Sequence, residues 1–479
     1  MSAPFVWIII PGLVSVALYL LRKWTRLVKS VGIFIAIILG LLAWQIPFGK
    51  AIPLGALPFI PTLTLAERLT VFGRQFILTD ASRSALVIIY IGTALWFIGA
   101  STIPISRLFI PLCLAMASLL TAAISVEPFL YAALFIQMAV LLGVPILSPP
   151  GQRVSRGVLR FLIFQTLGMI LLLFSGWMVS NIELYPNDTM MILRTSVLLG
   201  LGFAMAMSVF PFYTWIPLVA EETPPFSTAF VFFTLPEVIS LFALNIFTQF
   251  SWLQLAPTVY LSFSLVGMIM IASGGFWSIF QNNLGRIFGY AVISEIGLVI
   301  IAVGQILSAV QVSPYDGTNL ITRLPLAEFF FALLLPRGLN LAIWALSLAI
   351  IKTKCKDLNL QSVRGIAYQL PIASLSLALA SFSLAGLPLL AGFPVRAVLG
   401  IGIAQQSPLI AAFTLIGYFG LVIAALRSIS VLVSPAVERL WQINETRPQL
   451  VLLSLGCIFL IMVGTFPQFF LNGLNTFLP

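Results

Sequence analysis

The chain of 479 residues is 60% hydrophobic and only 8% charged. A soluble domain could not cover this much apolar surface, so the composition excludes a soluble globular protein. The formal net charge of +10 could indicate a nucleic-acid partner, but the basic residues lie in short segments between apolar runs, where they orient membrane helices, and no nucleic-acid partner is expected. Apolar runs of about twenty residues recur along the chain, which is the length that a helix needs to cross a bilayer, and the strand-like alternation of a membrane barrel is absent.

The N-terminal part of the chain predicts two spans and an external loop. Residues 4–21 form an apolar run that is followed by the basic sequence LRKWTR. A cleavable signal carries its positive charges before the apolar run, so this order predicts a retained span whose N-terminus is non-cytoplasmic. A second span is expected at 30–48, and the mixed charges and prolines of 49–83 predict an external loop with interfacial pieces.

The remaining apolar runs predict further membrane spans. They lie at 84–103, 106–126, 128–148, 158–180, 192–212, 226–248, 257–280, 287–309, 326–351, 370–404, 408–430 and 449–472. Together with the first two runs they give about fourteen spans. Most arginines and lysines then fall in the loops of one face, and this asymmetry predicts that both termini are non-cytoplasmic.

Two proline-rich interruptions break the apolar runs. Phe210–Pro225 reads FPFYTWIPLVAEETPP, and Ser383–Arg396 reads SLAGLPLLAGFPVR. Proline lacks the N–H that a helix needs, and a broken helix inside a bilayer survives only where protein or a polar cavity satisfies the freed groups. Broken helices in two halves of a chain are typical of transporters with inverted repeats. In the first interruption, Glu221 and Glu222 are interpreted either as an entrance for cations or as solvating side chains of a loop.

The residue types give no sign of a cofactor site. The chain contains no histidine, and Cys113, Cys355 and Cys457 show no metal-ligand spacing. Nucleotide and flavin motifs are absent from the sequence as well. No catalytic, cofactor-binding or metal-binding residue is therefore expected in this chain.

Three stretches, in one order, resemble a known family. FPFYTWIPLVAEETPPFSTAF, which begins at Phe210, is similar to the FPFHTWLP motif and the following APTPVSA motif of the antiporter-like membrane subunits of respiratory complex I (NADH/NAD(P)H:quinone oxidoreductase) and of Mrp-type cation/proton antiporters. Gly275–Gly297 and Asp357–Phe393 resemble two later motifs of that family. The region from 84 to 429 is therefore identified as the core of an antiporter-like subunit.

The resemblance implies an all-α polytopic membrane protein of about 14 transmembrane helices, with two inverted five-helix repeats that each contain a discontinuous helix. The expected divisions are N-terminal spans and an external loop at 1–83, a first repeat at 84–250 with its broken helix near 205–217, a second repeat at 251–434 with its broken helix near 386–396, and a C-terminal span at 435–479.

Members of the family carry ionisable side chains at mid-membrane, which pass protons or couple their movement to neighbouring subunits. Several of these positions are altered in this chain: Gln137 replaces a glutamate, Ala206 a lysine, Tyr213 a histidine and Pro236 a lysine. Glutamine and alanine cannot ionise, so the resemblance implies a degenerate first half-channel.

The second half keeps four ionisable residues at predicted membrane depth: Glu237, Glu295, Arg337 and Arg396. An ionised side chain there costs about 3 kcal/mol, so these residues should face inward and pair. Two interpretations stay open. The residues are structural salt bridges between helices, or they form a proton or ion path in which the glutamates exchange protons and the arginines act as a gate or as fixed counter-charges.

These features favour an antiporter-like transmembrane subunit of a multisubunit proton- or cation-translocating complex, either a complex I-like NAD(P)H:quinone oxidoreductase or an Mrp-type Na⁺/H⁺ antiporter. Quinone and NAD(P)H or ferredoxin would act only through partner subunits, and the partners of this chain would be other membrane subunits and the lipid bilayer. The alternatives are a structural paralogue that moves no ion and a subunit of an inorganic-carbon or sodium transport system. The membrane is either the plasma (inner) membrane or the thylakoid membrane.

Overall fold

The computed structural model describes residues 2–49, 51–52, 63–151, 153–182, 188–250, 257–312, 324–435 and 441–469. Most of these residues are helical, which confirms the all-α prediction. Part of the predicted external loop at 49–83 and the end of the predicted span at 449–472 lie outside the described residues. The described residues form two compact units: unit 1 contains those of Met1–Gln152 and Leu162–Ala206, and unit 2 contains those of Arg153–Phe161 and Met207–Asn475. The repeat boundaries expected from the family resemblance remain predictions.

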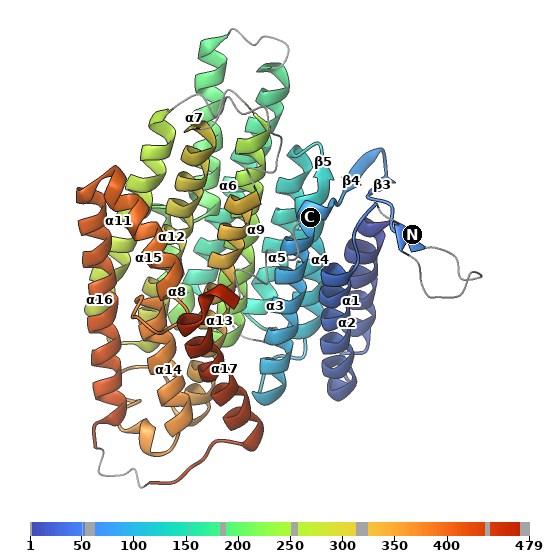
Figure 1. Ribbon diagram of the computed structural model, residues 1–479. Coiled ribbons are helices and arrows are strands. Elements are labelled where there is room, and N and C mark those ends of the chain that lie inside the picture. The colour runs from blue at the N-terminus through green and yellow to red at the C-terminus, as the bar shows by residue number, and fades with distance from the viewer. Residues whose placement is uncertain are drawn as a thin grey trace. The chain divides into compact units, whose positions relative to one another are not determined.

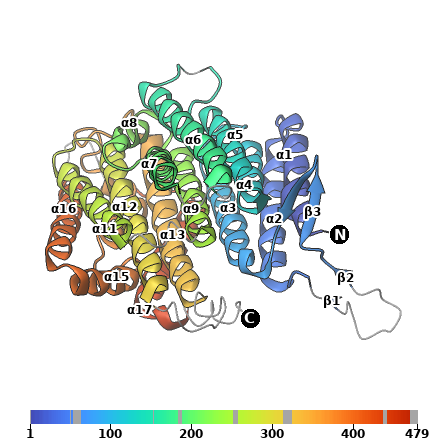
Figure 2. The same cartoon turned by 90° about the horizontal axis from the view of Figure 1, so that it is seen from above.

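Unit 1 contains a bundle of helices and two small sheets (Figures 1 and 2). Its helices are η1 (Phe5–Ile9), α1 (Ile10–Leu20), α2 (Thr25–Gln45), α3 (Arg83–Thr102), α4 (Phe109–Ser125), α5 (Leu130–Leu147), most of α6 (Arg156–Ile182) and α7 (Thr189–Ala206). Its core is largely apolar, and several of the polar groups inside it bind backbone groups. The buried indole of Trp7, for example, donates its N–H to the carbonyl oxygen of Leu39 at 3.0 Å.

The segment predicted as an external loop contains short strands. β1 (Ala51–Ile52) pairs with β2 (Leu63–Thr64), while β3 (Arg68–Val71), β4 (Arg74–Ile77) and β5 (Val126–Glu127) form a second antiparallel sheet. Between β3 and β4, Phe72 has φ 48° and Gly73 has φ 73°. A two-residue type I′ hairpin requires positive φ at both central residues, so this turn joins the two strands directly.

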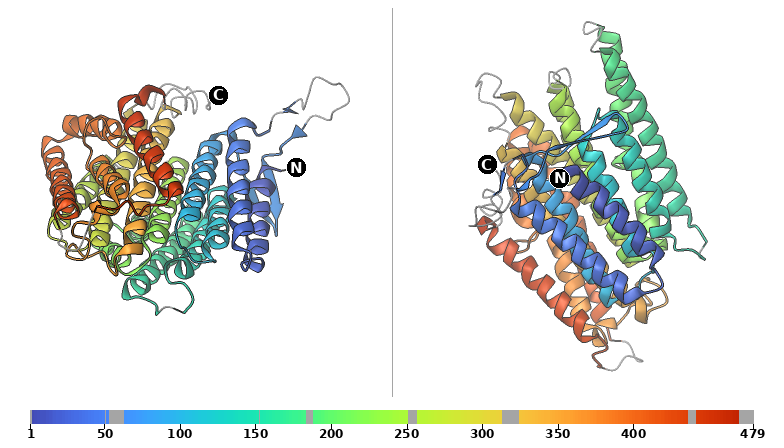
Figure 3. Two further views of the ribbon diagram at one scale, coloured as in Figure 1. Left: turned by 90° about the horizontal axis from the view of Figure 1, so that it is seen from below. Right: turned by 90° about the vertical axis from the view of Figure 1, so that its right-hand side faces the viewer.

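Unit 2 contains long helices that pack side by side. Its elements are η3 (Phe212–Thr214), α8 (Trp215–Glu222), α9 (Pro225–Gln249), α11 (Pro257–Ile279), α12 (Leu284–Val312), α13 (Leu324–Lys354), η5 (Ile366–Tyr368), α14 (Pro371–Leu384), α15 (Phe393–Gln406), α16 (Pro408–Val433) and α17 (Arg447–Thr465). Helix α11 packs against α12 and α16, and α13 packs against α9, α12 and α14 (Figures 1 and 3).

The helices identify a multi-pass membrane protein. Among the described residues, 11 helices are long and apolar enough to cross a membrane, and four shorter apolar helices lie at Phe5–Leu20, Phe109–Ser125, Pro371–Leu384 and Phe393–Gln405. The total of about fourteen spans stays a prediction. Large apolar side chains on outward faces fit contact with lipid: on α16, Leu415 is 66% exposed and Phe419 is 67% exposed.

Glycines allow α11 to approach its neighbours backbone to backbone. A Cβ atom at Gly275 of α11 would lie 1.8 Å from the carbonyl oxygen of Gly417 in α16. A Cβ atom at Gly267, also in α11, would lie 2.6 Å from the carbonyl oxygen of Gly297 in α12. Small residues are the usual means by which membrane helices pack this closely, so α11 links α12 to α16.

Candidate functional site

The second proline-rich interruption predicts a broken helix near 386–396. In the structure, the helix is interrupted between α14, which ends at Leu384, and α15, which begins at Phe393. Gly386 and Leu389 have φ values of 80° and 70°, the left-handed conformation that ends a helix. The break leaves backbone groups without hydrogen-bond partners inside the helix, and side chains bind some of these groups. The N–H of Gly392, for instance, donates to Oγ of Ser383 at 3.0 Å.

Arg396, in the first turns of α15, binds both the broken backbone and an acid. Its Nη1 donates to the carbonyl oxygen of Gly392 at 2.8 Å and to that of Ser383 at 3.4 Å. Its Nη2 donates to Oε1 of Glu295 in α12 and forms an ion pair whose side chains are only 7% and 3% exposed. One guanidinium therefore supports the break and neutralises a buried carboxylate.

Arg337, in α13, binds a carbonyl oxygen that a proline leaves free. Pro236 lies inside α9 and has no N–H to donate to the carbonyl of Phe232, four residues earlier. The Nη2 of Arg337 donates to that oxygen at 2.8 Å. The sequence alone shows Pro236 only as an altered family position. In the structure, Pro236 leaves the carbonyl oxygen of Phe232 free to accept the hydrogen bond from Arg337.

Glu237 follows Pro236 in α9 and is 1% exposed. Neither of its carboxylate oxygens has a hydrogen-bond partner in the described part of the chain. The charge of Arg337 acts electrostatically on Glu237, and the Nε and Nη1 of that arginine also lack hydrogen-bond partners among the described residues. A buried carboxylate without hydrogen bonds is costly when it is charged, so the charge of Glu237 depends strongly on its surroundings.

Unit 2 brings the four predicted ionisable residues together from α9, α12, α13 and α15. Their charges alternate, because Arg337 acts on both Glu237 and Glu295 and Glu295 is paired with Arg396. When both glutamates are ionised, the two acids and two arginines cancel in charge, which lowers the cost of charges inside a membrane. An arginine does not readily release a proton, so the two glutamates are the members of this charge line that can exchange one.

The altered positions of the first half carry uncharged side chains. In unit 1, Nε2 of Gln137 donates to Oγ1 of Thr166 at 2.9 Å. Ala206 is the last residue of α7, and its carbonyl oxygen accepts a hydrogen bond from Nε2 of Gln165 at 2.9 Å. Gln165 is 2% exposed and is not among the predicted residues, although a lone glutamine in the apolar run LRFLIFQTLG is a signal for it. In unit 2, Tyr213 is buried in η3.

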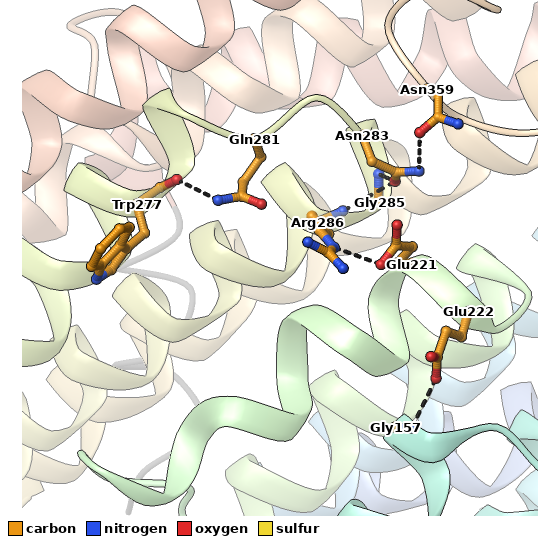
Figure 4. A network of polar contacts seen from close by, with 9 residues as sticks. All are labelled: Gly157, Glu221, Glu222, Trp277, Gln281, Asn283, Gly285, Arg286 and Asn359. Atoms are coloured by element: carbon orange, nitrogen blue, oxygen red, sulfur yellow. Dashed lines mark hydrogen bonds and ion pairs between the residues drawn. The ribbon is translucent and has the colours of Figure 1, made fainter.

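The two acids of the first interruption are engaged in polar contacts (Figure 4). They lie at the end of α8, which corrects their interpretation as loop residues: the helix continues to Glu222 although the segment is rich in proline. Oε2 of Glu221 lies 2.5 Å from Nε of Arg286, and Oε2 of Glu222 accepts a hydrogen bond from the N–H of Gly157 at 2.8 Å. Each carboxylate therefore binds another part of unit 2.

Asn283 forms three hydrogen bonds next to the ion pair of Glu221 and Arg286. Its Oδ1 accepts hydrogen bonds from the N–H groups of Gly285 at 2.8 Å and of Arg286 at 3.3 Å, in the first turn of α12. Its Nδ2 donates to Oδ1 of Asn359 at 3.1 Å, as Figure 4 shows. This is the arrangement of a helix N-cap, and it fixes the position of Arg286 opposite α8.

Replacement of Glu221 with glutamine is expected to change the free energy of unfolding by less than about 1 kcal/mol, because a partly exposed ion pair is screened by solvent. The arginine and glutamate side chains of this pair are 41% and 29% exposed. Thermal unfolding of the purified variant measures the effect. A loss well above 1 kcal/mol would contradict the expectation that this pair is screened by solvent.

A family model described as "NADH:quinone oxidoreductase/Mrp antiporter, TM" matches residues 152–423, more than half of the chain. The chain belongs to this antiporter family. Among members of the family, it is 28% identical over 284 residues to NADH-quinone oxidoreductase subunit N 1 of Herpetosiphon aurantiacus, over 57% of this chain and 53% of the relative. It is 28% identical over 232 residues to NADH-quinone oxidoreductase subunit N of Pelagibacter ubique, over 48% and 45% of the two chains. The chain thus spans about half the length of the curated relatives that it matches.

Chains of three solved membrane complexes have a similar fold. The fold matches a chain of the membrane-bound sulfane sulfur reductase, an archaeal respiratory membrane complex, with a TM-score of 0.79 at 15% identity over 99% of this chain and 96% of that one. It matches a chain of the Mrp complex from Dietzia sp. DQ12-45-1b with a TM-score of 0.75 at 14% identity over 99% and 96%. For respiratory complex I from Thermus thermophilus the TM-score is 0.70 at 18% identity over 99% and 97%.

Proposed function

We propose that the chain is an antiporter-like transmembrane subunit of a multisubunit complex that translocates protons or cations, of the complex I-like or Mrp type. The observation that carries this proposal is Glu237, a buried acid without a hydrogen-bond partner among the described residues, beside the fixed charge of Arg337. Buried ionisable side chains within membrane helices usually mark proton or ion paths. The family of the chain and the names of its relatives support the same function.

In this proposal, the residues of the charge line have different roles. Glu237 takes up and releases the proton, because no hydrogen bond from the described residues holds its carboxylate. Arg337 supplies a fixed positive charge that lowers the cost of the charged carboxylate. Glu295 is held by Arg396 and keeps the break in place, so it exchanges protons only when that pair opens.

The first half-channel is degenerate in this proposal. Gln137 and Ala206 cannot ionise, and the amides of Gln137 and Gln165 form hydrogen bonds with neutral groups. A proton relay needs groups that both gain and lose protons, which these residues do not provide. Proton movement through this subunit is therefore restricted to the second half.

Partner subunits complete the proposed complex. Quinone and NAD(P)H or ferredoxin would bind to those subunits, while this chain contacts other membrane subunits and lipid. We expect both termini on the non-cytoplasmic side, because the positive charges concentrate in the loops of the other face. The membrane is the plasma (inner) membrane or the thylakoid membrane.

Replacement of Glu237 with glutamine tests the proposal in vesicles that contain the native complex. Glutamine keeps the shape of the side chain but cannot carry a proton, so the pH gradient formed per amount of assembled complex is expected to fall several-fold. The matched control is Glu221→Gln, which removes a partly exposed acid of the same unit and should leave the gradient unchanged. A normal gradient in the Glu237→Gln complex would overturn the proposed role of this residue.

A second candidate function is that of a structural paralogue that moves no ion. The closed ion pair between Glu295 and Arg396 favours it, because buried pairs often serve only to fix helices. In that case Glu237→Gln and Glu295→Gln complexes that assemble normally would form the same pH gradient as the native complex.

A further inference from the structure

The backbone of the break leaves room for the long side chain of Arg396. A Cβ atom at Gly386 would lie 2.7 Å from Cδ of Arg396, and the φ of 80° at Gly386 favours glycine. A Cβ atom at Gly392 would lie even closer to Nη1 of the same arginine. A methyl group at either glycine would therefore displace the arginine, so the two glycines border a space that this side chain fills.

The hydrogen-bond acceptors around this space match the fork of a guanidinium group. Nη1 of Arg396 donates to the carbonyl oxygens of Ser383 and Gly392, one on each side of the break, while Nη2 donates to the carboxylate of Glu295. A guanidinium group holds several N–H donors in a fixed plane, whereas lysine has one nitrogen at the end of a flexible chain. The arrangement therefore selects arginine, because a single ammonium group cannot occupy both nitrogen positions at once.

An aromatic ring of α16 lies against the guanidinium group. Cζ of Arg396 is 5.5 Å from the centroid of the Tyr418 ring, within the range in which a cation and a ring attract each other. The attraction is stronger when water is kept from the cation, and Arg396 is only 8% exposed. The neighbouring residue Gly417 packs against the backbone of Ile271 in α11, which fixes α16 at this point. Helix α16 therefore holds the ring beside the arginine in a fixed position.

We propose that the break between α14 and α15 is a socket for the side chain of Arg396, and that Tyr418 is the positioning residue that keeps this arginine on Glu295. We name the surrounding residues the arginine socket: Ser383, Gly386, Gly392, Glu295 and Tyr418. They come from both sides of the break and from α12 and α16. One side chain therefore joins the broken helix to two other helices, and the break is a rigid joint rather than a hinge.

The arginine socket bears on the proposed function, because an arginine that is held in place keeps Glu295 ionised and out of proton exchange. This consequence rests on the proposed function, whereas the socket itself does not. A normal pH gradient in the Glu237→Gln complex would overturn the proposed role of Glu237 and leave the socket intact. A break that opens freely in the native complex would overturn the socket and leave the role of Glu237 to its own test.

Hydrogen–deuterium exchange of the native complex in lipid nanodiscs tests the socket through peptides that cover the break. The N–H of Gly392 is bound to Oγ of Ser383 at 3.0 Å, so it exchanges only when the break opens. Tyr418→Leu removes the ring beside the cation and is expected to speed this exchange about tenfold. The matched control Phe419→Leu removes a ring that is 67% exposed on the same helix and should leave the rate unchanged. Equal rates in the Tyr418→Leu and native complexes would overturn the role of Tyr418.

Replacement of Arg396 with lysine tests the fit of the socket to a guanidinium group. Lysine keeps the positive charge but cannot bind the broken backbone and Glu295 through two nitrogens, so exchange at Gly392 is expected to rise about tenfold or more. The matched control is Arg286→Lys, which alters the partly exposed pair with Glu221 and should leave exchange at the break unchanged. Native exchange in Arg396→Lys would overturn the socket, because a positive charge alone would then hold the break.

Infrared difference spectra separate positioning by Tyr418 from a purely structural role. When Tyr418→Leu is added to the Glu237→Gln complex, a titrating C=O stretching band of a protonated carboxyl group is expected, because the arginine no longer holds Glu295. The band should be lost when Glu295→Gln is added as well, and Tyr418→Phe, which keeps the ring, should not produce it. A ring that only fills space would change exchange at the break without freeing Glu295, so absence of the band in Tyr418→Leu would overturn the positioning role.

Discussion

Replacement of Arg396 with leucine is expected to lower the free energy of unfolding by about 3–5 kcal/mol, the usual cost of removing one partner from a buried ion pair. The carboxylate of Glu295 would remain buried without its counter-charge. The carbonyl oxygens of Gly392 and Ser383 would also lose a donor at the break between α14 and α15. Thermal unfolding of the purified protein in detergent and the amount of assembled complex in the membrane measure this effect.

The double variant Glu295→Leu, Arg396→Leu provides the control for that loss. When both charges are replaced by apolar side chains, no buried charge is left unpaired, and much of the stability should return. What remains lost reports the hydrogen bonds that Arg396 makes to the broken backbone. A double variant as unstable as Arg396→Leu would mean that the ion pair contributes little and that the backbone contacts dominate.

Replacement of Gly275 with alanine is expected to force α11 and α16 apart. The new Cβ atom would lie 1.8 Å from the carbonyl oxygen of Gly417, and a backbone atom cannot move aside as a flexible side chain can. Overpacking of this kind costs about 1–3 kcal/mol, and the contact with backbone places Gly275→Ala at the upper end of that range. The thermal unfolding midpoint of the purified protein measures the loss.

Gly200→Ala is the matched control, since Gly200 lies in α7 and a Cβ atom there would meet nothing within 4 Å. Alanine favours a helix over glycine by about 1 kcal/mol, so this variant should be as stable as the native protein or slightly more stable. If Gly275→Ala were as harmless as Gly200→Ala, the close approach of α11 and α16 would be wrong.

The broad features of the fold follow from the sequence because they depend on local composition. Apolar runs of membrane length predict helices that cross a bilayer, and the clustered glycines and prolines of Ser383–Arg396 predict a break. Local sequence patterns do not predict structure that depends on the pairing of very short strands. The strands β3 and β4 have only four residues each, and Phe72 and Gly73 between them do not form a common hairpin sequence.

The contacts of the charge line could be predicted only in part. The sequence predicts that Glu237, Glu295, Arg337 and Arg396 face inward and pair, because buried charges are costly. All four are buried and Glu295 pairs with Arg396, but the carboxylate of Glu237 has no hydrogen-bond partner among the described residues. Which acid binds which arginine depends on tertiary structure. The bond from Arg337 to the carbonyl of Phe232 exists because Pro236 frees that oxygen on another helix, and no local pattern reveals such a match.

We propose that Glu237 is the exchangeable acid of unit 2, whereas Glu295 is held by Arg396. Infrared difference spectra of the complex in lipid, recorded between acidic and alkaline pH, measure it directly through the C=O stretching band of a protonated carboxyl group. We expect a titrating band that is lost in Glu237→Gln and kept in Glu295→Gln. A band that persists in Glu237→Gln, or that disappears only in Glu295→Gln, would contradict it.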